Sequence, residues 1–178
     1  MIKGSNFIIR HIVRGDLPTL VPLLNDCDVR GEYLPSAMHS PIDLERQIEA
    51  DGMANDGLMR LVIVEQPIDT IIGTIWHAKA VPYFNAREIG YTLSSEHRGR
   101  GITTEAVRLL VRYLFNSSLV NRLEIRMDTR NQASEKVAIK CGFQKEGVSR
   151  GANFVRGHHV DMNLYALLRH EWLKSMNL

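Results

Sequence analysis

Residues 87–102 read REIGYTLSSEHRGRGI, and the rest of the chain can be arranged around this segment. It opens with the apolar alternation of a β-strand, passes through a short basic loop that contains Gly99 and Gly101, and enters an amphipathic helix. Glycine turns and helix N-termini present backbone N–H groups, so the segment predicts a site for a phosphate or pyrophosphate. Arg98 and Arg100 are expected to add side-chain charge at the same place.

The loop matches neither of two common phosphate motifs. A P-loop would continue with Gly-Lys-Ser or Gly-Lys-Thr, and none follows here. A dinucleotide fingerprint would carry a third glycine and an acidic residue closing the next strand, and both are missing. Taken alone, the Gly-x-Gly pattern fits a plain tight turn between a strand and a helix about as well as it fits an anion site.

The composition is that of a globular domain. With 178 residues, 44% hydrophobic and 24% charged, the chain suits a single α/β domain with one sizeable core. A formal net charge of +2 gives little support to nucleic-acid binding. Cys27 and Cys141 form no metal or redox motif, and no segment approaches membrane-spanning length, so we expect a cytoplasmic protein with free thiols and no membrane contact. The histidines His77, His158 and His159 make no recognisable metal set.

The hydrophobic pattern predicts alternating strands and helices. Strands are expected at residues 7–12, 59–65, 70–79, 87–94 and 122–128, and a final hairpin is expected from 143–154 and 159–166 with its turn at Arg156 and Gly157. Helices are expected after an Asp16 N-cap, after a Ser40 capping box, from Ile102 onward, and from Ala133 to Cys141 with Gly142 as the terminating residue. Residues 28–40 show no clear period, and Gly31, Pro35 and His39 indicate a loop.

Further segments downstream narrow the interpretation. Asn131 to Ser134, then Cys141-Gly142-Phe143, follow the basic loop in order. Together with the loop they resemble the GNAT superfamily of acetyl-CoA-dependent N-acetyltransferases. The tail from Glu146-Gly147-Val148 to Trp172 is similar to the RimJ/RimL branch, which acetylates protein N-termini. The resemblance implies one GNAT-type domain over residues 7–172, with a central, mixed, mostly antiparallel twisted sheet flanked by helices.

The same resemblance implies acetyl-CoA as the cofactor. Its pyrophosphate would lie on the N–H groups from Arg98 to Thr103, and its pantetheine arm would follow the strand that ends at Leu93 and Ser94. Asn131 would contact the pantetheine or adenine side, and its type and position also suit an ordinary helix N-cap. The residues expected to bind the cofactor are Leu93, Ser94, Arg98, Gly99, Arg100, Gly101, Ile102, Thr103, Asn131 and Ser134.

The resemblance assigns the acid that serves the departing thiolate to Ser134. Many GNAT enzymes carry a tyrosine seven residues after the asparagine, but this chain has Ala138 there. In the RimJ/RimL branch a serine three residues after the asparagine takes the role, and Ser134 matches that position. The alternative is an ordinary serine in the first turn of a helix.

At the position expected for the general base, the sequence departs from the RimJ/RimL pattern. Some members carry a glutamate shortly after the Glu-Gly pair, where this chain has Asn153. Several GNAT enzymes place the base on the central strand, which makes Glu88 the candidate. A carboxylate partly buried beside a cleft would have a raised pKa, suited to deprotonating an ammonium group. The alternatives are a structural carboxylate paired with Arg87 or Arg126, and deprotonation through water.

We therefore expect an N-acetyltransferase that moves the acetyl group directly to a primary amine in a ternary complex. Cys141 is expected to face the core, which argues against a covalent enzyme intermediate. The expected acceptor is a protein or peptide α-amine, such as that of a ribosomal protein. The alternatives are a small amine (an aminoglycoside, a polyamine or an amino-acid derivative) and a non-catalytic acetyl-CoA-binding module. Specificity is expected in the early helices and the last hairpin, with Trp76 either in the acceptor pocket or in the core. A homodimer is expected by analogy with the branch.

Overall fold

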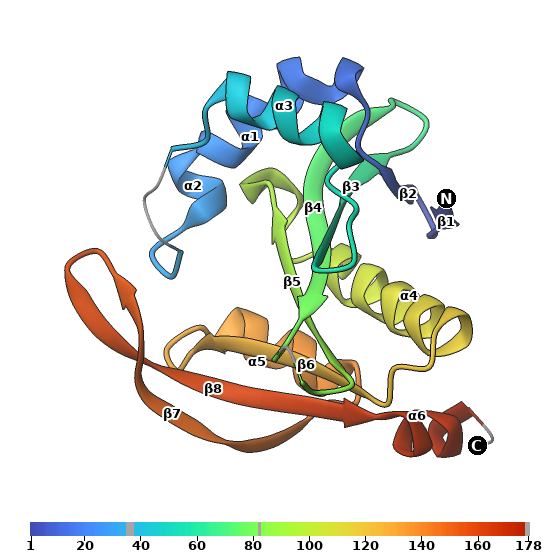
Figure 1. Ribbon diagram of the computed structural model, residues 1–178, viewed down its shortest axis with the longest axis vertical. Coiled ribbons are helices and arrows are strands. Elements are labelled where there is room, and N and C mark those ends of the chain that lie inside the picture. The colour runs from blue at the N-terminus through green and yellow to red at the C-terminus, as the bar shows by residue number, and fades with distance from the viewer. Residues whose placement is uncertain (35–37, 82, 177–178) are drawn as a thin grey trace.

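The computed structural model describes residues 1–34, 38–81 and 83–176. Within these ranges the strands form an eight-stranded sheet in the order β1-β2-β3-β4-β5-β6-β8-β7 (Figure 1). Neighbouring strands are antiparallel except β5 and β6, which are parallel. The strands are β1 (Ile2–Lys3), β2 (Phe7–His11), β3 (Leu58–Glu65), β4 (Thr70–Lys79), β5 (Ala86–Leu93), β6 (Arg122–Asp128), β7 (Gln144–Val155) and β8 (His158–Leu168).

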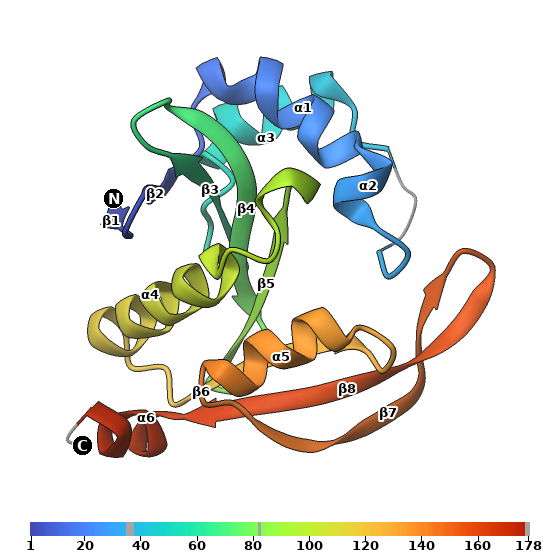
Figure 2. The ribbon, with the colours of Figure 1, turned by 180° about the vertical axis from the view of Figure 1, so that it is seen from behind.

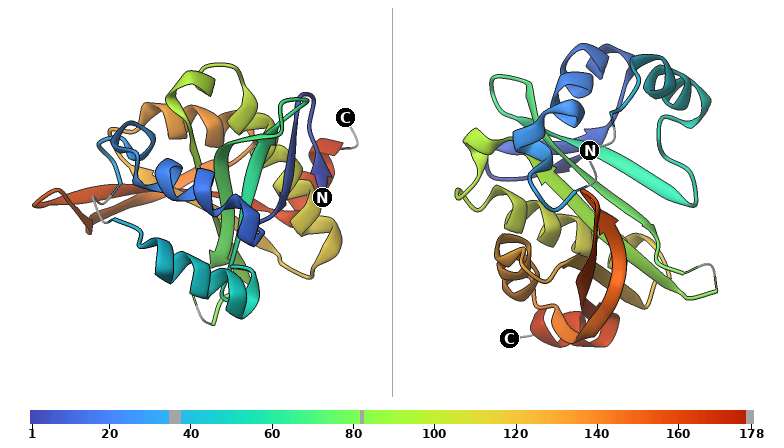
Figure 3. Two further views of the ribbon diagram at one scale, coloured as in Figure 1. Left: turned by 90° about the horizontal axis from the view of Figure 1, so that it is seen from above. Right: turned by 90° about the vertical axis from the view of Figure 1, so that its left-hand side faces the viewer.

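Helices cover both faces of the sheet (Figure 2 and Figure 3). They are η1 (Arg14–Asp16), α1 (Leu17–Asn25), α2 (Cys27–Arg30), α3 (Pro41–Asp51), η2 (Ser95–His97), α4 (Ile102–Ser117), α5 (Gln132–Lys140) and α6 (Arg169–Met176). Helices α1 and α3 bury Leu20 and Leu44 against β3 and β4 on one face. Helices α4 and α5 bury a larger cluster, including Leu110 and Ala138, on the other. The expected α/β fold, with a mostly antiparallel twisted sheet between helices, is confirmed.

Local signals in the sequence account for several element ends. The Ser40 hydroxyl accepts a hydrogen bond from the Asp43 N–H at 3.4 Å and begins α3. The predicted hairpin turns at Arg156 and Gly157, which have φ of 50° and 86°. These positive values suit the tight turn that joins twisted antiparallel strands. Gly142 has φ of 86° just beyond α5, as expected for a residue that ends a helix.

Other elements differ from the expectation. Asp16 stands before α1 but does not cap it, because its carboxylate accepts two bonds from the Arg10 guanidinium and one from the Val13 N–H. A loop was expected at residues 28–40, but its first residues, as far as Arg30, belong to α2. The Asp26 carboxylate caps the N-terminus of that helix. Pro35 lies outside the described residues. The sequence patterns also missed β1 and α6.

Helix α6 is held in place by contacts with residues distant in sequence, which no local sequence pattern predicts. Its first residue, Arg169, donates hydrogen bonds to the carbonyl of Phe115 in the last turn of α4 and to those of Ser118 and Val120 just beyond it. The last carbonyls of a helix have no partner within the helix, so this guanidinium serves as their cap. Trp172 then packs on the Phe115 ring at a centroid distance of 5.3 Å.

His77 is a polar residue inside the apolar layer. It lies on β4 between Met59 and Ile89 and is only 6% exposed. Neither ring nitrogen has a hydrogen-bond partner among the described residues. Burial, together with the charge of Arg87, lowers the pKa of His77 from 6.5 to about 4. The side chain is therefore neutral in the folded protein at pH values where the unfolded chain is already protonated.

Acid should destabilise the protein through this residue. Between pH 6.5 and 4 the unfolded state binds a proton that the folded state excludes, so stability falls as the pH is lowered. By pH 5 this lowers the free energy of unfolding by about 2 kcal/mol relative to pH 7.5. Urea unfolding of the wild type and of His77→Leu at both pH values measures the effect. The variant should lack this share of the pH dependence, and equal pH dependence in both proteins would contradict the assignment.

Candidate active site

The candidate site begins where β5 and β6 separate. The two strands pair only through Ala86, Arg87 and Glu88, although β5 runs on to Leu93 and β6 to Asp128. In Figure 1, β4 and β5 run down the centre whereas β6 and β8 cross beneath them. Backbone N–H and C=O groups on the facing edges beyond Glu88 are therefore left without a strand partner. A cavity of about 620 Å³ lies at this opening.

The predicted phosphate loop forms one end of the cavity. Gly99 and Gly101 have φ of 76° and 81°, values that residues with a Cβ adopt at a cost. Gly101 stands at the N-cap of α4 with no side-chain cap. The first N–H groups of the helix therefore remain available to a ligand. The residues of this loop and first turn that line the cavity are Arg98, Gly99, Gly101, Ile102, Thr103 and Thr104.

Arg98 makes contacts that the sequence did not indicate. Its guanidinium donates to the carbonyl oxygens of Leu93 at 3.2 Å, Asp28 at 2.6 Å and Val29 at 3.1 Å, so it ties α2 to the loop. The backbone N–H of Arg98 donates to the Ser95 carbonyl and is therefore not free to bind an anion. Arg98 thus links two walls of the cavity and also lines it.

Two other expected cofactor contacts lie outside the cavity lining. Arg100 is exposed, and the Ser94 hydroxyl lies 2.6 Å from Nδ1 of His97. Leu93 and Asn131 do line the cavity. Lys136 and Lys140 on α5 also line it, and the sequence reasoning did not single them out. Their spacing of four residues, which places both on one side of a helix, was the available signal.

Strand alternation divides the site between the two faces of the sheet. Glu88, Gly90 and Thr92 share the face of β4 that carries Trp76: the Thr92 hydroxyl lies 3.0 Å from that of Thr74, and a Cβ on Gly90 would lie 2.1 Å from the Trp76 ring. Tyr91 points to the opposite face, toward α5. Trp76 itself is half-buried and lines the cavity, which favours the acceptor-pocket alternative.

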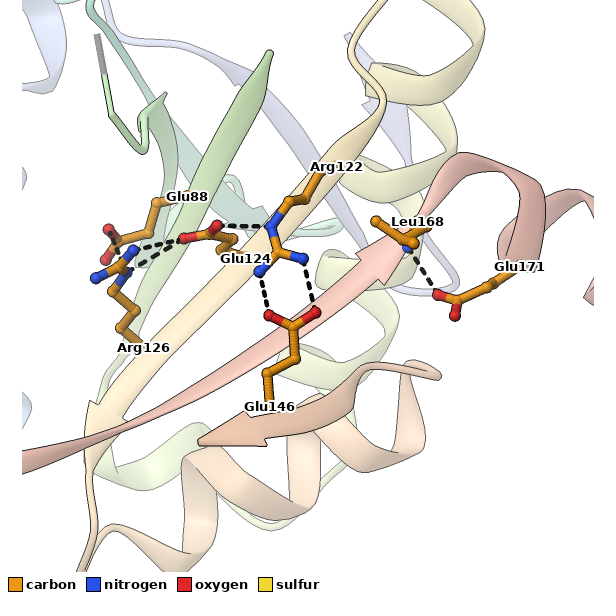
Figure 4. Close-up of polar contacts among 7 residues, drawn as sticks. All are labelled: Glu88, Arg122, Glu124, Arg126, Glu146, Leu168 and Glu171. Atoms are coloured by element: carbon orange, nitrogen blue, oxygen red, sulfur yellow. Dashed lines mark hydrogen bonds and ion pairs between the residues drawn. The ribbon is translucent and has the colours of Figure 1, made fainter. Parts of the chain in front are cut away.

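Glu88 lies in a network of carboxylates and arginines (Figure 4). Its Oε2 is 3.6 Å from Nε of Arg126, whose guanidinium also binds the buried Glu124 at 2.8 Å. Arg122 binds the other oxygen of Glu124 at 2.7 Å and continues to Glu146 at 2.7 Å. Burial, together with the negative charge of Glu124, raises the pKa of Glu88 against the opposing charge of Arg126.

The structure bears on both alternatives for Glu88. Arg87 does not pair with it, because that guanidinium binds Asp56 at 3.0 Å. Arg126 does pair with it, at the longer distance given above, and the Glu88 side chain remains 27% exposed and lines the cavity. Glu88 is therefore both ion-paired and accessible to a molecule in the cavity. Asn153, at the position of the missing branch glutamate, lines the cavity as well.

Ser134 lies on the other wall, in the first turn of α5. The Asn131 carboxamide oxygen accepts from the Ser134 N–H at 3.0 Å, so Asn131 is the helix N-cap. The Ser134 hydroxyl lies 2.9 Å from the Tyr91 hydroxyl, and both residues line the cavity. Ala138, one turn further along, is completely buried. Sequence reasoning missed Tyr91, because nothing local shows that its phenol reaches α5.

The early segment from residue 28 to 34 closes the third side. The Arg156 guanidinium at the hairpin turn donates to the Gly31 carbonyl at 2.9 Å, and the Tyr33 hydroxyl donates to the Arg130 carbonyl at 3.3 Å. Together with the hydrogen bonds of Arg98, these contacts connect the segment to the phosphate loop on one side and to the final hairpin on the other. Arg30, Glu32 and Leu34 of this segment line the cavity.

Cys141 is not part of the cavity lining. Its thiol donates to the Thr104 carbonyl at 3.4 Å, and burial raises its pKa to about 11. A thiol with a high pKa is a poor nucleophile at neutral pH. The geometry therefore gives no support to a covalent intermediate on Cys141.

The glycine loop allows a direct test with coenzyme A, the ligand that the sequence resemblance implies. A Cβ at Gly99 or Gly101 would meet no heavy atom within 4 Å, so side chains have room there. The double substitution of both glycines by aspartate should abolish coenzyme A binding, because it places carboxylates against phosphates. Substitution of both by asparagine is the matched control, since asparagine tolerates positive φ and is uncharged. Calorimetry that found equal affinities for the two folded double variants would contradict the phosphate assignment.

Comparison with known proteins agrees with this geometry. Residues 6–144 match the acetyltransferase (GNAT) domain family. The uncharacterized N-acetyltransferase YoaA of Bacillus subtilis (strain 168) is 37% identical over 95% of this chain and 97% of its own length. The ribosomal-protein-serine acetyltransferase of Escherichia coli (strain K12) is 29% identical over 74% of each chain.

The fold has close counterparts among solved structures. Spermidine N-acetyltransferase from Vibrio cholerae, in complex with CoA and spermine, superposes with a TM-score of 0.83 over 96% of this chain and 99% of that chain, at 20% identity. None of the helices in the described ranges of our protein has the length and apolar character that a bilayer crossing requires. On the family match, the shared architecture and the cavity at the strand opening, the chain belongs to the GNAT family and is an acetyl-CoA-dependent N-acetyltransferase.

Proposed function

We propose that the acceptor is the N-terminal α-amine of a protein or peptide, with a ribosomal protein as the leading class. The support is that relatives include the ribosomal-protein-serine acetyltransferase and the [ribosomal protein uS5]-alanine N-acetyltransferase of Escherichia coli. Such an acceptor also fits the cytoplasmic location that the sequence predicts. A non-catalytic module, which the sequence alone allowed, has no support from this family membership.

The observation that carries the proposed chemistry is the placement of Glu88 and Ser134 in one cavity, on opposite faces of the sheet. Glu88 would accept the proton of the acceptor ammonium on the face that carries Trp76. The freed amine would attack the acetyl carbonyl within the strand opening. Ser134 would hydrogen-bond the departing sulfur from the α5 side. Unpaired N–H groups of β5 are suited to polarise the acetyl carbonyl.

The charges at the acceptor end favour a peptide over a polyamine. A polyamine carries several positive charges and requires unpaired carboxylates. Glu88 is paired with Arg126, and Asp128 is held by Nε and Nη2 of Arg130 at 3.0 and 2.7 Å. Arg30 and Glu32 add one charge of each sign to the cavity lining. Spermidine acetyltransferases share the fold at 20% identity, which by itself does not extend to the substrate.

A thiol-release assay with acetyl-CoA tests the acceptor class. The panel contains peptides with free N-terminal serine or alanine, the same peptides with blocked N-termini, spermidine and spermine, and an aminoglycoside. We expect turnover only with free N-termini. Turnover with spermidine at a higher kcat/KM than with the peptides would replace the proposed acceptor by a polyamine.

Glu88→Gln should lower kcat roughly 100-fold, the usual size of a general-base contribution, with the affinity for acetyl-CoA unchanged. In the wild type kcat should fall as the pH drops through the raised pKa of Glu88, because a protonated carboxyl cannot accept a proton. The variant should lose that acidic limb. Glu146→Gln is the control, since it removes a carboxylate from the same arginine network outside the cavity. An unchanged pH profile in Glu88→Gln would remove Glu88 from the mechanism.

A further inference from the structure

The Tyr91 side chain lies in the cavity and has no part in the chemistry described above. Its hydroxyl oxygen is 2.9 Å from the Ser134 hydroxyl and 3.4 Å from the Ser134 carbonyl oxygen. We propose that Tyr91 is a positioning residue: its phenol donates a hydrogen bond to the Ser134 hydroxyl, so that Ser134 directs its own proton at the sulfur of coenzyme A. This inference rests on the role proposed for Ser134.

The direction of the hydrogen bond follows from the groups present. A serine hydroxyl has one donor and two acceptor sites. If it accepts from Tyr91, its single proton remains available to the sulfur. A phenol is a stronger donor than an aliphatic alcohol, and its one proton is better placed for the Ser134 hydroxyl at 2.9 Å than for the Ser134 carbonyl at 3.4 Å. Burial also raises the pKa of Tyr91, which keeps the phenol protonated at working pH.

The surroundings hold both partners in place. The Tyr91 ring packs against the main core cluster, and β5 directs it toward α5. Ser134 lies in the first turn of α5, where its N–H is held by Asn131. The hydrogen bond therefore joins the two walls that diverge at the strand opening. A bond between two anchored groups holds the Ser134 hydroxyl in one orientation with little further loss of conformational freedom.

The proposed role balances the protons of the transfer. The acceptor ammonium gives one proton to Glu88, and the freed amine forms the new C–N bond. The C–S bond breaks with its electron pair on sulfur, and the nitrogen gives up its second proton to water as the amide forms. Ser134 donates a hydrogen bond to that thiolate without losing its proton, and water protonates the thiolate afterwards. Hydrogen bonds in a chain polarise one another, so donation from Tyr91 makes the Ser134 O–H a stronger donor.

Titration of bound coenzyme A tests the inference without an acceptor. The thiolate absorbs in the ultraviolet, and subtraction of the ligand-free protein removes the signal of Cys27 and Cys141. The proposal predicts that the pKa of the bound thiol rises by about one unit, a tenfold change in its ionisation constant, in Tyr91→Phe. Ser134→Ala should raise it at least as much. In the Ser134→Ala protein, adding Tyr91→Phe should have no further effect.

Tyr165→Phe is the matched control. The Tyr165 hydroxyl also reaches α5, where it donates to the Glu135 carboxylate at 2.6 Å, but Tyr165 does not line the cavity. Its loss should lower the melting temperature and leave the bound-thiol pKa unchanged. A bound-thiol pKa that is equal in the wild type and Tyr91→Phe would overturn the inference. So would an effect of Tyr91→Phe that persists in full without the Ser134 hydroxyl.

Turnover separates this inference from the proposed function. With an active acceptor, Tyr91→Phe should lower kcat about tenfold, the loss of one hydrogen bond at the transition state, with both KM values unchanged. An unchanged or higher kcat would mean that Ser134 donates to Tyr91 instead, and the inference would fail. If no amine is acetylated but the thiol titration behaves as predicted, the proposed acceptor class fails while the Tyr91 assignment stands.

Discussion

The early end of pairing between β5 and β6 is the constraint on which the site depends. Parallel strands lie about 4.8 Å apart, whereas packed helices need about 8–10 Å between their axes. Helix α4 follows β5 and α5 follows β6, and both helices pack on the same face and contact each other. The strands stop pairing after Glu88, toward the carboxyl ends from which both helices start. The separation leaves two backbone edges unpaired, and such edges require hydrogen-bond partners. A cofactor arm that carries amide groups can supply them.

The charge network around Glu124 lies at the point where the strands part. Glu124 is almost completely buried, and a carboxylate in that position is costly unless positive groups surround it. Arg122 and Arg126 supply the positive charge from one strand, two residues to either side. Arg126 is thereby held beside Glu88 at a distance that moderates the effect of burial without forming a tight pair. The arginine that stabilises the buried Glu124 thus also opposes the rise that burial causes in the pKa of Glu88.

The parts of the fold that were predictable from sequence are those governed by local rules. The strand–loop–helix segment, the Ser40 cap and the hairpin turn at Gly157 each depend on residues near in sequence. Arg98 was assigned to the phosphate because its position at the loop is visible, whereas its carbonyl partners on α2 lie about seventy residues away. Tyr91 was missed for the same reason, since only the packed strand and helix bring its phenol to Ser134. At Asp16 a local signal competes with a tertiary contact. The residue is suited to cap a helix, but its carboxylate binds Arg10 instead, because the guanidinium donates two charge-assisted hydrogen bonds.

The sequence resemblance implies ionisable groups at the positions of Ala138 and Asn153, and the proposed mechanism assigns their roles to residues that β5 positions. Successive residues of a strand face opposite sides, so two residues three positions apart lie on opposite faces. Glu88 and Tyr91 have that spacing. A base on one face and a hydroxyl pair on the other match the demands of acyl transfer, in which the amine enters from one side and the thiolate leaves on the other. In the proposed mechanism one strand would therefore provide the backbone edge along the opening, a carboxylate toward the acceptor and, through Ser134, a hydrogen bond toward the sulfur. Sheet pairing with β4 holds these parts in register, so their mutual placement does not depend on the variable segments that surround the acceptor.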